Sequence, residues 1–196
     1  MNKLNIKIII ASVREGRFGD KPTKWIADIA KDIDDFSVEL LDLKDYPLPI
    51  FSEAVSPADV QGAYANPLVN PWAEKIASAD GFVIVTPEYN HGYPSSLKNN
   101  MDYLYKEWNK KPIAFVGYGT TGGAFSVGQI RQVAIELQMA PVRTAVHIAS
   151  PWSLIEKDGA LKSGAFDKYA NNARKMLEQL EWWAKALKDA RGHEGE

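Results

Sequence analysis

Five short apolar runs alternate along the chain with amphipathic segments, and this alternation constrains the fold more than any other feature. The runs are rich in β-branched residues and cover 4–11, 37–43, 81–86, 112–118 and 142–148. Near-continuous apolar runs are typical of strands buried on both faces, and the segments between them can form the covering helices. The alternation therefore predicts an α/β fold, a three-layer doubly wound domain around a five-stranded parallel sheet.

Apolar residues recur three and four positions apart between these runs, as on the buried face of a helix. One face contains Trp25, Ile26, Ile29, Ala30 and Ile33, and another contains Leu97, Met101, Leu104 and Tyr105 in a helix expected over 96–109. Two further faces contain Ile130, Val133, Ala134 and Leu137, and Tyr169, Ala173, Met176, Leu177, Leu180, Trp183, Ala184 and Leu187. An additional helix is expected to begin at Pro71, with Asn70 as its N-cap.

The length of 196 residues suggests one domain, expected over 1–190, with 191–196 as a frayed tail. Segment 44–70 is rich in proline, serine and asparagine and has few periodic positions. A loop this long inside a compact domain is usually functional or covers another subunit, and it could hold a short helix near 57–65.

Composition excludes several classes of protein. The chain has no cysteine, which rules out disulfides, zinc–thiolate sites, iron–sulfur clusters and cysteine nucleophiles. Its three histidines, at 91, 147 and 193, lack metal-ligand spacing, so no metal site is expected. A formal charge of −2 argues against a nucleic-acid binder. The apolar stretch ending at Ala11 is too short for a membrane span, and we expect a soluble cytoplasmic protein.

Three unusual loops follow predicted strands, where open α/β sheets bind their ligands. The first loop, 11–20, and the start of the next helix carry four cations against Glu15 and Asp20. A phosphate could neutralise this cluster by accepting from helix amides, the Ser12 hydroxyl and an arginine. From this loop alone, a solvated basic loop is an equally good interpretation.

The second loop, 86–96, contains two prolines, a glycine, two tyrosines and an asparagine. A planar ring could pack against its aromatic groups, although an ordered turn whose tyrosines pack on a neighbouring helix is the favoured alternative from this loop alone. We expect His91 to be a loop or interface residue and His147 to be a satisfied core or sheet-end residue, rather than catalysts.

The third loop, 117–122, has the spacing G-x-G-x-x-G between a strand and a helix. It follows the fourth strand rather than the first, and run 142–148 has no acidic residue to meet a ribose, so the dinucleotide-binding match is weak. The glycines instead indicate close approach of the backbone to a flat ligand. The chain has no G-x-x-x-x-G-K-[ST] and no G-x-S-x-G motif.

Three stretches together resemble the NADPH-dependent FMN reductase family. They are Ser-Val-Arg-Glu-Gly-Arg at 12–17, Pro-Glu-Tyr-Asn-His-Gly-Tyr-Pro at 87–94 and Leu-Lys-Asn-Asn-Met-Asp-Tyr-Leu at 97–104. The family includes quinone, azo and chromate reductases, and the resemblance covers about three-quarters of the chain, from the first predicted strand through the fifth. It implies a flavodoxin-like fold with strand order 2-1-3-4-5 and FMN at the switch between strands 1 and 3.

The resemblance also implies which residues hold the cofactor. Ser12, Arg14, Arg17, Phe18 and Gly19 match the phosphate loop, and Pro87, Glu88, Tyr89 and Asn90 match the loop beside the isoalloxazine, with Gly119, Thr120 and Gly122 on its other side. Many members carry serine and asparagine in place of Arg17 and Gly19, so phosphate contacts based on charge are expected here. Tyr103 stands where tryptophan is common.

The resemblance implies an enzyme that transfers a hydride from NADPH or NADH to FMN and then two electrons to a quinone-like or other small acceptor. The chemistry takes place on the flavin, and no residue stands out as a catalytic acid or base. Two other functions stay open, a flavodoxin-type electron carrier and a dinucleotide-binding dehydrogenase that uses loop 117–122. An α/β module without a ligand is a third.

Helix 96–109 carries apolar or aromatic residues on more than one face, including Tyr103 and Trp108. Because a helix that covers a sheet needs one apolar stripe, the surplus predicts at least a dimer formed around this helix. The family resemblance also implies dimers or dimers of dimers, so a homodimer or homotetramer is expected. The alternative is that Tyr103 and Trp108 pack under loop 44–70 of their own chain.

Overall fold

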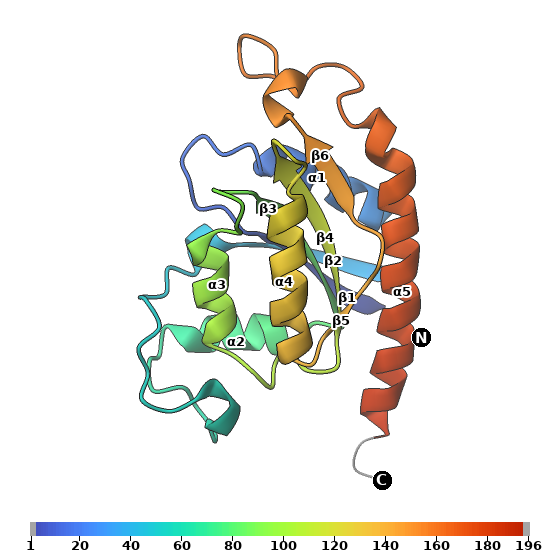
Figure 1. The fold of residues 1–196 in the computed structure, drawn as a ribbon. Helices are drawn as coiled ribbons and strands as arrows, with labels where there is room; N and C mark the ends of the chain where they lie inside the picture. The colour runs from blue at the N-terminus through green and yellow to red at the C-terminus, as the bar shows by residue number, and fades with distance from the viewer. Residues whose placement is uncertain (1–2, 194–196) are drawn as a thin grey trace.

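The computed structural model describes residues 3–193 and has one parallel sheet at its centre (Figure 1). Its strands are β1 Leu4–Ile10, β2 Phe36–Asp42, β3 Gly81–Pro87, β4 Pro112–Gly119, β5 Ala140–Pro141 and β6 Val146–Ala149. The order is β2-β1-β3-β4-β5, and β6 also pairs with β4. All pairings are parallel, which confirms the predicted fold class and strand order.

Helices cover both faces of the sheet (Figure 1). On one face lie α1 Asp20–Lys31 and α5 Ala170–Gly192, whose buried side chains share a core with Ile6, Ile8 and Val116. On the other face α2 Val69–Ala77, α3 Ser95–Asp102 and α4 Ala124–Glu136 share a second core with Ile9, Ile84 and Phe115. Because successive side chains of a strand point to opposite faces of the sheet, the strands contribute to two separate cores.

The predicted fifth strand, 142–148, is wrong in its bounds because the chain leaves the sheet between β5 and β6. Side chains from two helices bind the backbone in this gap. Arg131 donates to the carbonyl oxygens of Val142 and Arg143, at 2.6 and 3.0 Å, and the Thr144 amide donates to the side chain of Gln179 at 3.1 Å. These polar groups are thereby satisfied without a neighbouring strand.

Two helix boundaries also differ from the prediction. Helix α2 begins at Val69 with Leu68 at the N-cap position, so Asn70 lies inside the helix instead of capping it. Helix α3 ends at Asp102, well before residue 109. At the C-terminus α5 continues to Gly192. Arg191 in its last turn donates to the Lys110 carbonyl oxygen at 2.6 Å. The first two residues of the expected tail, 191 and 192, are therefore helical. Residues 194–196 of that tail lie outside the described residues.

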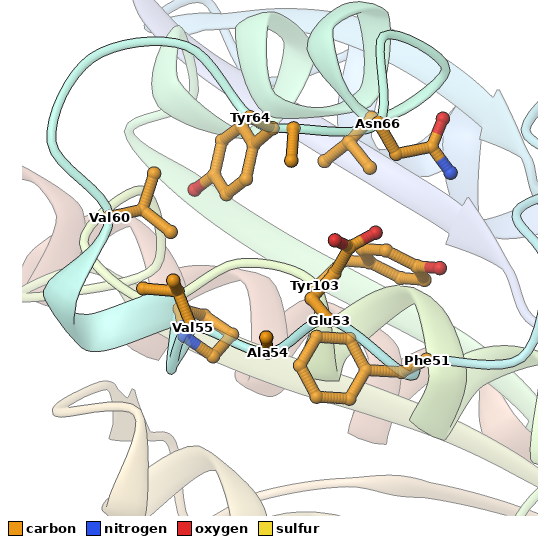
Figure 2. A pocket seen from close by; sticks show the side chains of 11 residues that line it. Phe51, Glu53, Ala54, Val55, Val60, Tyr64, Asn66 and Tyr103 are labelled. Carbon is orange, nitrogen blue, oxygen red and sulfur yellow. The ribbon is translucent and has the colours of Figure 1, made fainter.

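Segment 44–70 contains little regular structure. The short helix expected near 57–65 is a single 3₁₀ turn, Pro57–Asp59, and another 3₁₀ turn, Leu43–Asp45, opens the segment. The segment encloses a small apolar pocket of about 130 Å³, to which Phe51, Val55, Val60, Tyr64 and Tyr103 contribute side chains (Figure 2).

The aromatic residues after α3 pack inside their own chain. Trp108 is fully buried, with its ring 4.9 Å from Phe82 and 5.9 Å from Trp72. Tyr103 is 2% exposed and packs edge-on against Phe51 of segment 44–70 at 5.1 Å. The surplus of aromatic residues that predicted a dimer around 96–109 is therefore used within one subunit, and that basis for an oligomer is wrong.

None of the helices in the part of the chain that the structure describes has the length and apolar character of a membrane span.

Candidate active site

The ends of β1, β3, β4 and β6 border one cleft of about 360 Å³. Its walls are formed by Arg14, Gly16, Arg17, Phe18, Pro87, Glu88, Tyr89, Tyr118, Gly119, Pro151, Trp152 and Ile155. Seven of the expected cofactor residues line it: Arg14, Arg17, Phe18, Pro87, Glu88, Tyr89 and Gly119. The other five, Ser12, Gly19, Asn90, Thr120 and Gly122, belong to the same loops but not to the cleft wall. All three loops singled out in the sequence therefore meet at one edge of the sheet.

The N-terminus of α1 suits an anion. Its N-cap is Gly19, and no side chain of the described residues caps the helix. A Cβ atom at position 19 would lie 2.7 Å from the hydroxyl of Tyr118, so a larger residue would clash with this wall of the cleft. Because the first amides of a helix carry a partial positive charge, an uncapped end next to the exposed Arg14 favours a negatively charged group.

Three hydroxyl groups gather beside this helix end. The hydroxyls of Ser12 and Tyr89 are hydrogen-bonded at 2.7 Å. The hydroxyl of Tyr118 is buried, and within residues 3–193 it has no hydrogen-bond partner. Burial raises the pKa of Tyr118 above its ordinary value, and the nearby Ser12 hydroxyl opposes that rise only in part. A buried hydroxyl without a partner is costly, so its place on the cleft wall indicates a ligand acceptor.

Arg17 is engaged by the protein itself. Its side chain is 6% exposed and donates to the Ser12 carbonyl oxygen at 2.6 Å and to both oxygens of Asp42. Its Nε also donates to Asp20 at 2.7 Å. Asp42 holds the pKa of Arg17 above its ordinary value. Arg17 thus ties the first loop to the end of β2.

Arg14 differs from Arg17 in its surroundings. Its side chain is exposed, has no acidic partner among the described residues, and lies 5.6 Å from the centre of the Tyr89 ring. Phe18 packs on Tyr118 with ring centres 5.3 Å apart, which supports the floor of the cleft. Of the two arginines in the loop, Arg14 is the one whose charge is available to an incoming anion.

Glu88 joins the second loop to the third. Its carboxylate accepts from the Thr121 hydroxyl at 2.7 Å and from the Phe125 amide at 3.0 Å, so it caps the N-terminus of α4. Its own amide donates to the Tyr118 carbonyl oxygen at 2.9 Å. A Cβ atom on Gly119 would lie 3.0 Å from the Cβ of Glu88, so the glycine permits this close contact between the loops.

Asn90 and His91 form a tight two-residue turn. Both have positive φ, 50° and 63°, and the amides and carbonyls of Tyr89 and Gly92 pair across them at 2.8 and 2.9 Å. Gln129 of α4 donates to the His91 carbonyl oxygen at 2.8 Å. The turn is therefore fixed to the same helix that Glu88 caps.

The third loop is held by His147, as a sheet-end residue can do. Its Nδ1 lies 3.0 Å from the Gly122 carbonyl oxygen, and a Cβ atom on Gly122 would lie 2.9 Å from the Cβ of His147. Gly122 has a φ of 70°, which favours glycine. Thr120 is exposed next to it. Gly122 and Thr120 therefore shape the loop beside the cleft.

Five residues of the cleft wall were not among the expected cofactor residues: Gly16, Tyr118, Pro151, Trp152 and Ile155. Gly16 and Tyr118 lie within the first and third loops, and those positions could have identified them. The other three follow β6, whose bounds were predicted incorrectly, so no sequence signal connected them with the other loops.

Comparisons with known proteins agree with this geometry. Residues 4–153 match the family model of NADPH-dependent FMN reductases. An NAD(P)H-dependent FMN reductase of Schizosaccharomyces pombe is 40% identical over 143 residues, 72% of each chain. A quinone reductase of Escherichia coli is 33% identical over 143 residues, 69% of this chain and 71% of the relative.

The fold is also that of solved flavoenzymes. FerB, an NAD(P)H:acceptor oxidoreductase from Paracoccus denitrificans, superposes with a TM-score of 0.73 at 21% identity, over 94% of this chain and 98% of its own. The fold is shared even where the sequences have diverged. With the matched family model and the 40% identical relative, the chain is a member of the NADPH-dependent FMN reductase family.

Proposed function

We propose that this protein is an FMN-dependent oxidoreductase that transfers a hydride from NAD(P)H to the flavin and then two electrons to a quinone-like or other small acceptor. Family membership supports the cofactor and the hydride donor. Curated relatives named as quinone reductases support the class of acceptor. The observation that carries the proposal is the cleft itself, where an uncapped helix end, Arg14 and an unpartnered Tyr118 hydroxyl lie beside two loops suited to a flat ring.

The residues present fit FMN. In our proposal the phosphate is held by Ser12, Arg14 and the first turn of α1, with Arg17, Phe18 and Gly19 shaping that end. The ring lies against Pro87, Glu88, Tyr89 and Asn90, with Gly119, Thr120 and Gly122 on its other side. When bound, FMN supplies the redox chemistry, accepting a hydride and returning two electrons.

The protein contributes binding, orientation and exclusion of water. Glu88, Thr121 and the Phe125 amide hold the second and third loops in fixed relation, so the wall that meets the ring is formed before the cofactor binds. The Ser12–Tyr89 pair supplies hydroxyl groups at the boundary between the first and second loops. We assign no proton transfer to a side chain.

Steady-state kinetics test the reaction. One open flavin face that serves both substrates in turn predicts ping-pong kinetics, with parallel double-reciprocal lines when the quinone concentration is varied. Intersecting lines would indicate a ternary complex and a separate acceptor site. An absence of steady NAD(P)H oxidation with any quinone would favour an electron carrier instead, although the formal charge of −2 is small for such a protein.

We also propose a homodimer or homotetramer, with α4 in the interface. Phe125 and Ile135 on this helix are 52% and 66% exposed. Gly128 lies between them, exposed, and a Cβ atom there would meet nothing within 4 Å. Glycine inside a helix lowers stability by roughly 1 kcal/mol relative to alanine. Close approach of a second subunit would explain why a glycine stands at this position.

A further inference from the structure

Trp152 is a large aromatic residue at the mouth of the cleft. Its side chain is 62% exposed, although it belongs to the cleft wall together with Glu88, Tyr89 and Gly119. Among the described residues no ring packs against it, whereas the exposed Trp182 has Trp183 at 5.1 Å and the exposed Phe125 has His91 at 4.7 Å. An indole left open to water is unfavourable, so its exposed face is available to a partner.

The backbone that carries Trp152 is firmly held. Ser150 has a φ of 49°, a left-handed conformation that is uncommon for a residue other than glycine. Its amide donates to the Gly119 carbonyl oxygen at 2.9 Å, and its own carbonyl oxygen accepts from the Ser153 amide and hydroxyl at 2.9 and 2.7 Å. The position of Trp152 is therefore coupled to Gly119, the last residue of β4 and part of the cleft wall.

A second set of contacts closes the segment behind this turn. Lys162 donates its ammonium group to the Ser153 carbonyl oxygen at 2.8 Å and its amide to the Leu154 carbonyl oxygen at 2.9 Å. Ile155 and Leu161 pair in an antiparallel bridge. These hydrogen bonds fix the backbone of residues 150–162, so the indole is held at the cleft. A mobile surface loop would lack such contacts.

We propose that Trp152 is a flavin-binding residue whose indole packs against the isoalloxazine ring and so contributes to the affinity for the ring rather than for the phosphate. The inference rests on the proposed function, because it needs a flavin in the cleft. Two observations support a flat aromatic ligand: the indole has no ring partner among the described residues, and it lines the cleft together with Tyr89 and the close-packed Gly119. Aromatic pairs favour such offset or edge-to-face contacts.

The experiment compares FMN with riboflavin, which has the same ring and no phosphate. Flavin affinity is measured by fluorescence titration for the wild type, Trp152→Ala, Trp152→Phe and the control Trp182→Ala, which removes an equally exposed tryptophan that does not line the cleft. We expect Trp152→Ala to lose about tenfold in affinity for both flavins, Trp152→Phe to recover most of it, and the control to match the wild type. Bound flavin should also be brighter in Trp152→Ala, because contact with an indole quenches flavin emission.

The outcomes separate this inference from the proposed function. If the wild type binds neither flavin, the proposed function fails. If the wild type binds FMN and Trp152→Ala binds both flavins equally well, the inference is wrong while the function stands. A loss for FMN alone would place the indole at the phosphate end and would also overturn the ring contact. Circular dichroism of Trp152→Ala and Trp152→Phe shows whether each change in affinity belongs to a folded protein.

Discussion

At the scale of single residues, the two arginines of the first loop have different tasks. Arg17 is buried against Asp42, and Arg14 is exposed without an acidic partner among the described residues. Arg14→Ala should weaken FMN binding by about 1.5–3 kcal/mol, the range for a hydrogen bond to a charged group. Riboflavin binding, measured in the same fluorescence titration, should hardly change. Equal losses for the two flavins would mean that Arg14 does not bind the phosphate.

Arg17→Ala should act mainly on stability. The substitution leaves Asp42 without its bidentate partner, and we expect a loss of about 3 kcal/mol in the free energy of unfolding in urea.

Burial by itself would raise the pKa of Asp42, but the hydrogen bonds from Arg17 and the Lys44 amide hold it below 3.8. The pair therefore stabilises the fold above that pH and is lost as the pH falls through the folded pKa. An Asp42→Asn variant should lose less stability than the wild type on acidification, and an equal loss would contradict the assignment.

Lys111 gives a pH dependence of the same sign as Asp42, but in the alkaline range. Its ammonium group donates to the carbonyl oxygens of Ile76 and Ala77 at 2.8 and 2.7 Å, at the end of α2, and burial lowers its pKa to about 8. Between pH 8 and its ordinary value of 10.5 the unfolded chain binds more protons than the folded one. Stability relative to a Lys111→Met variant should therefore rise with pH across this window. Urea unfolding at several pH values measures the difference in the free energy of unfolding between the two proteins. A difference that does not change with pH would show that Lys111 is not buried as described.

At the scale of elements, Glu88 connects two loops and a helix. Glu88→Ala removes both the Thr121 contact and the cap on α4 and should cost about 1–2 kcal/mol of stability. Thr121→Val removes only the first contact, so it should cost roughly half as much. The comparison is made by urea unfolding. Equal effects of the two substitutions would mean that the Phe125 amide does not depend on Glu88.

The strands show how far the sequence predicts the elements. β1, β3 and β4 were located correctly because each is buried on both faces and so appears as a continuous apolar run. The break between β5 and β6 was not predicted, since it depends on Arg131 and Gln179, side chains that approach from two helices. The strand order itself came from resemblance to a family, because periodicity alone carries no information about order.

The candidate site shows the same limit. Motifs in the three loops identified most of the cleft, because glycine, proline and tyrosine at strand ends are local signals. The partner of Arg17 lies 25 residues away at Asp42, and no spacing rule connects them. Trp152 follows β6, whose bounds were not predicted correctly, so only the folded chain shows that it lines one cleft with Tyr89 and Glu88.

At the scale of the whole molecule, substitutions at Trp108 and on α4 should have different effects on folding and assembly. Trp108→Glu would bury a charge among Trp72 and Phe82, so we expect a protein that does not fold rather than a folded monomer. Circular dichroism and sedimentation distinguish these outcomes. If the Trp108→Glu variant were folded and monomeric, that result would support an interface around residues 96–109 after all.

Gly128→Leu tests the proposed interface on α4. The position is open within one chain, so the helix should gain slightly in stability while the oligomer dissociates. Ala186→Leu is the matched control, since it adds bulk at an exposed position of α5. Sedimentation of the flavin-bound protein should give the mass of one subunit for Gly128→Leu only. A wild-type protein that sediments at 21.8 kDa would contradict the oligomer altogether.

The proposed function requires this cleft to bind FMN and to let NADPH reduce it. The decisive measurement is the absorption spectrum of the purified protein titrated with FMN and then treated with NADPH without oxygen. We expect saturable binding at one FMN per subunit, loss of the flavin absorption on addition of NADPH, and its return when a quinone is added. Failure to bind FMN, or bound FMN that NADPH leaves oxidised, would contradict the account.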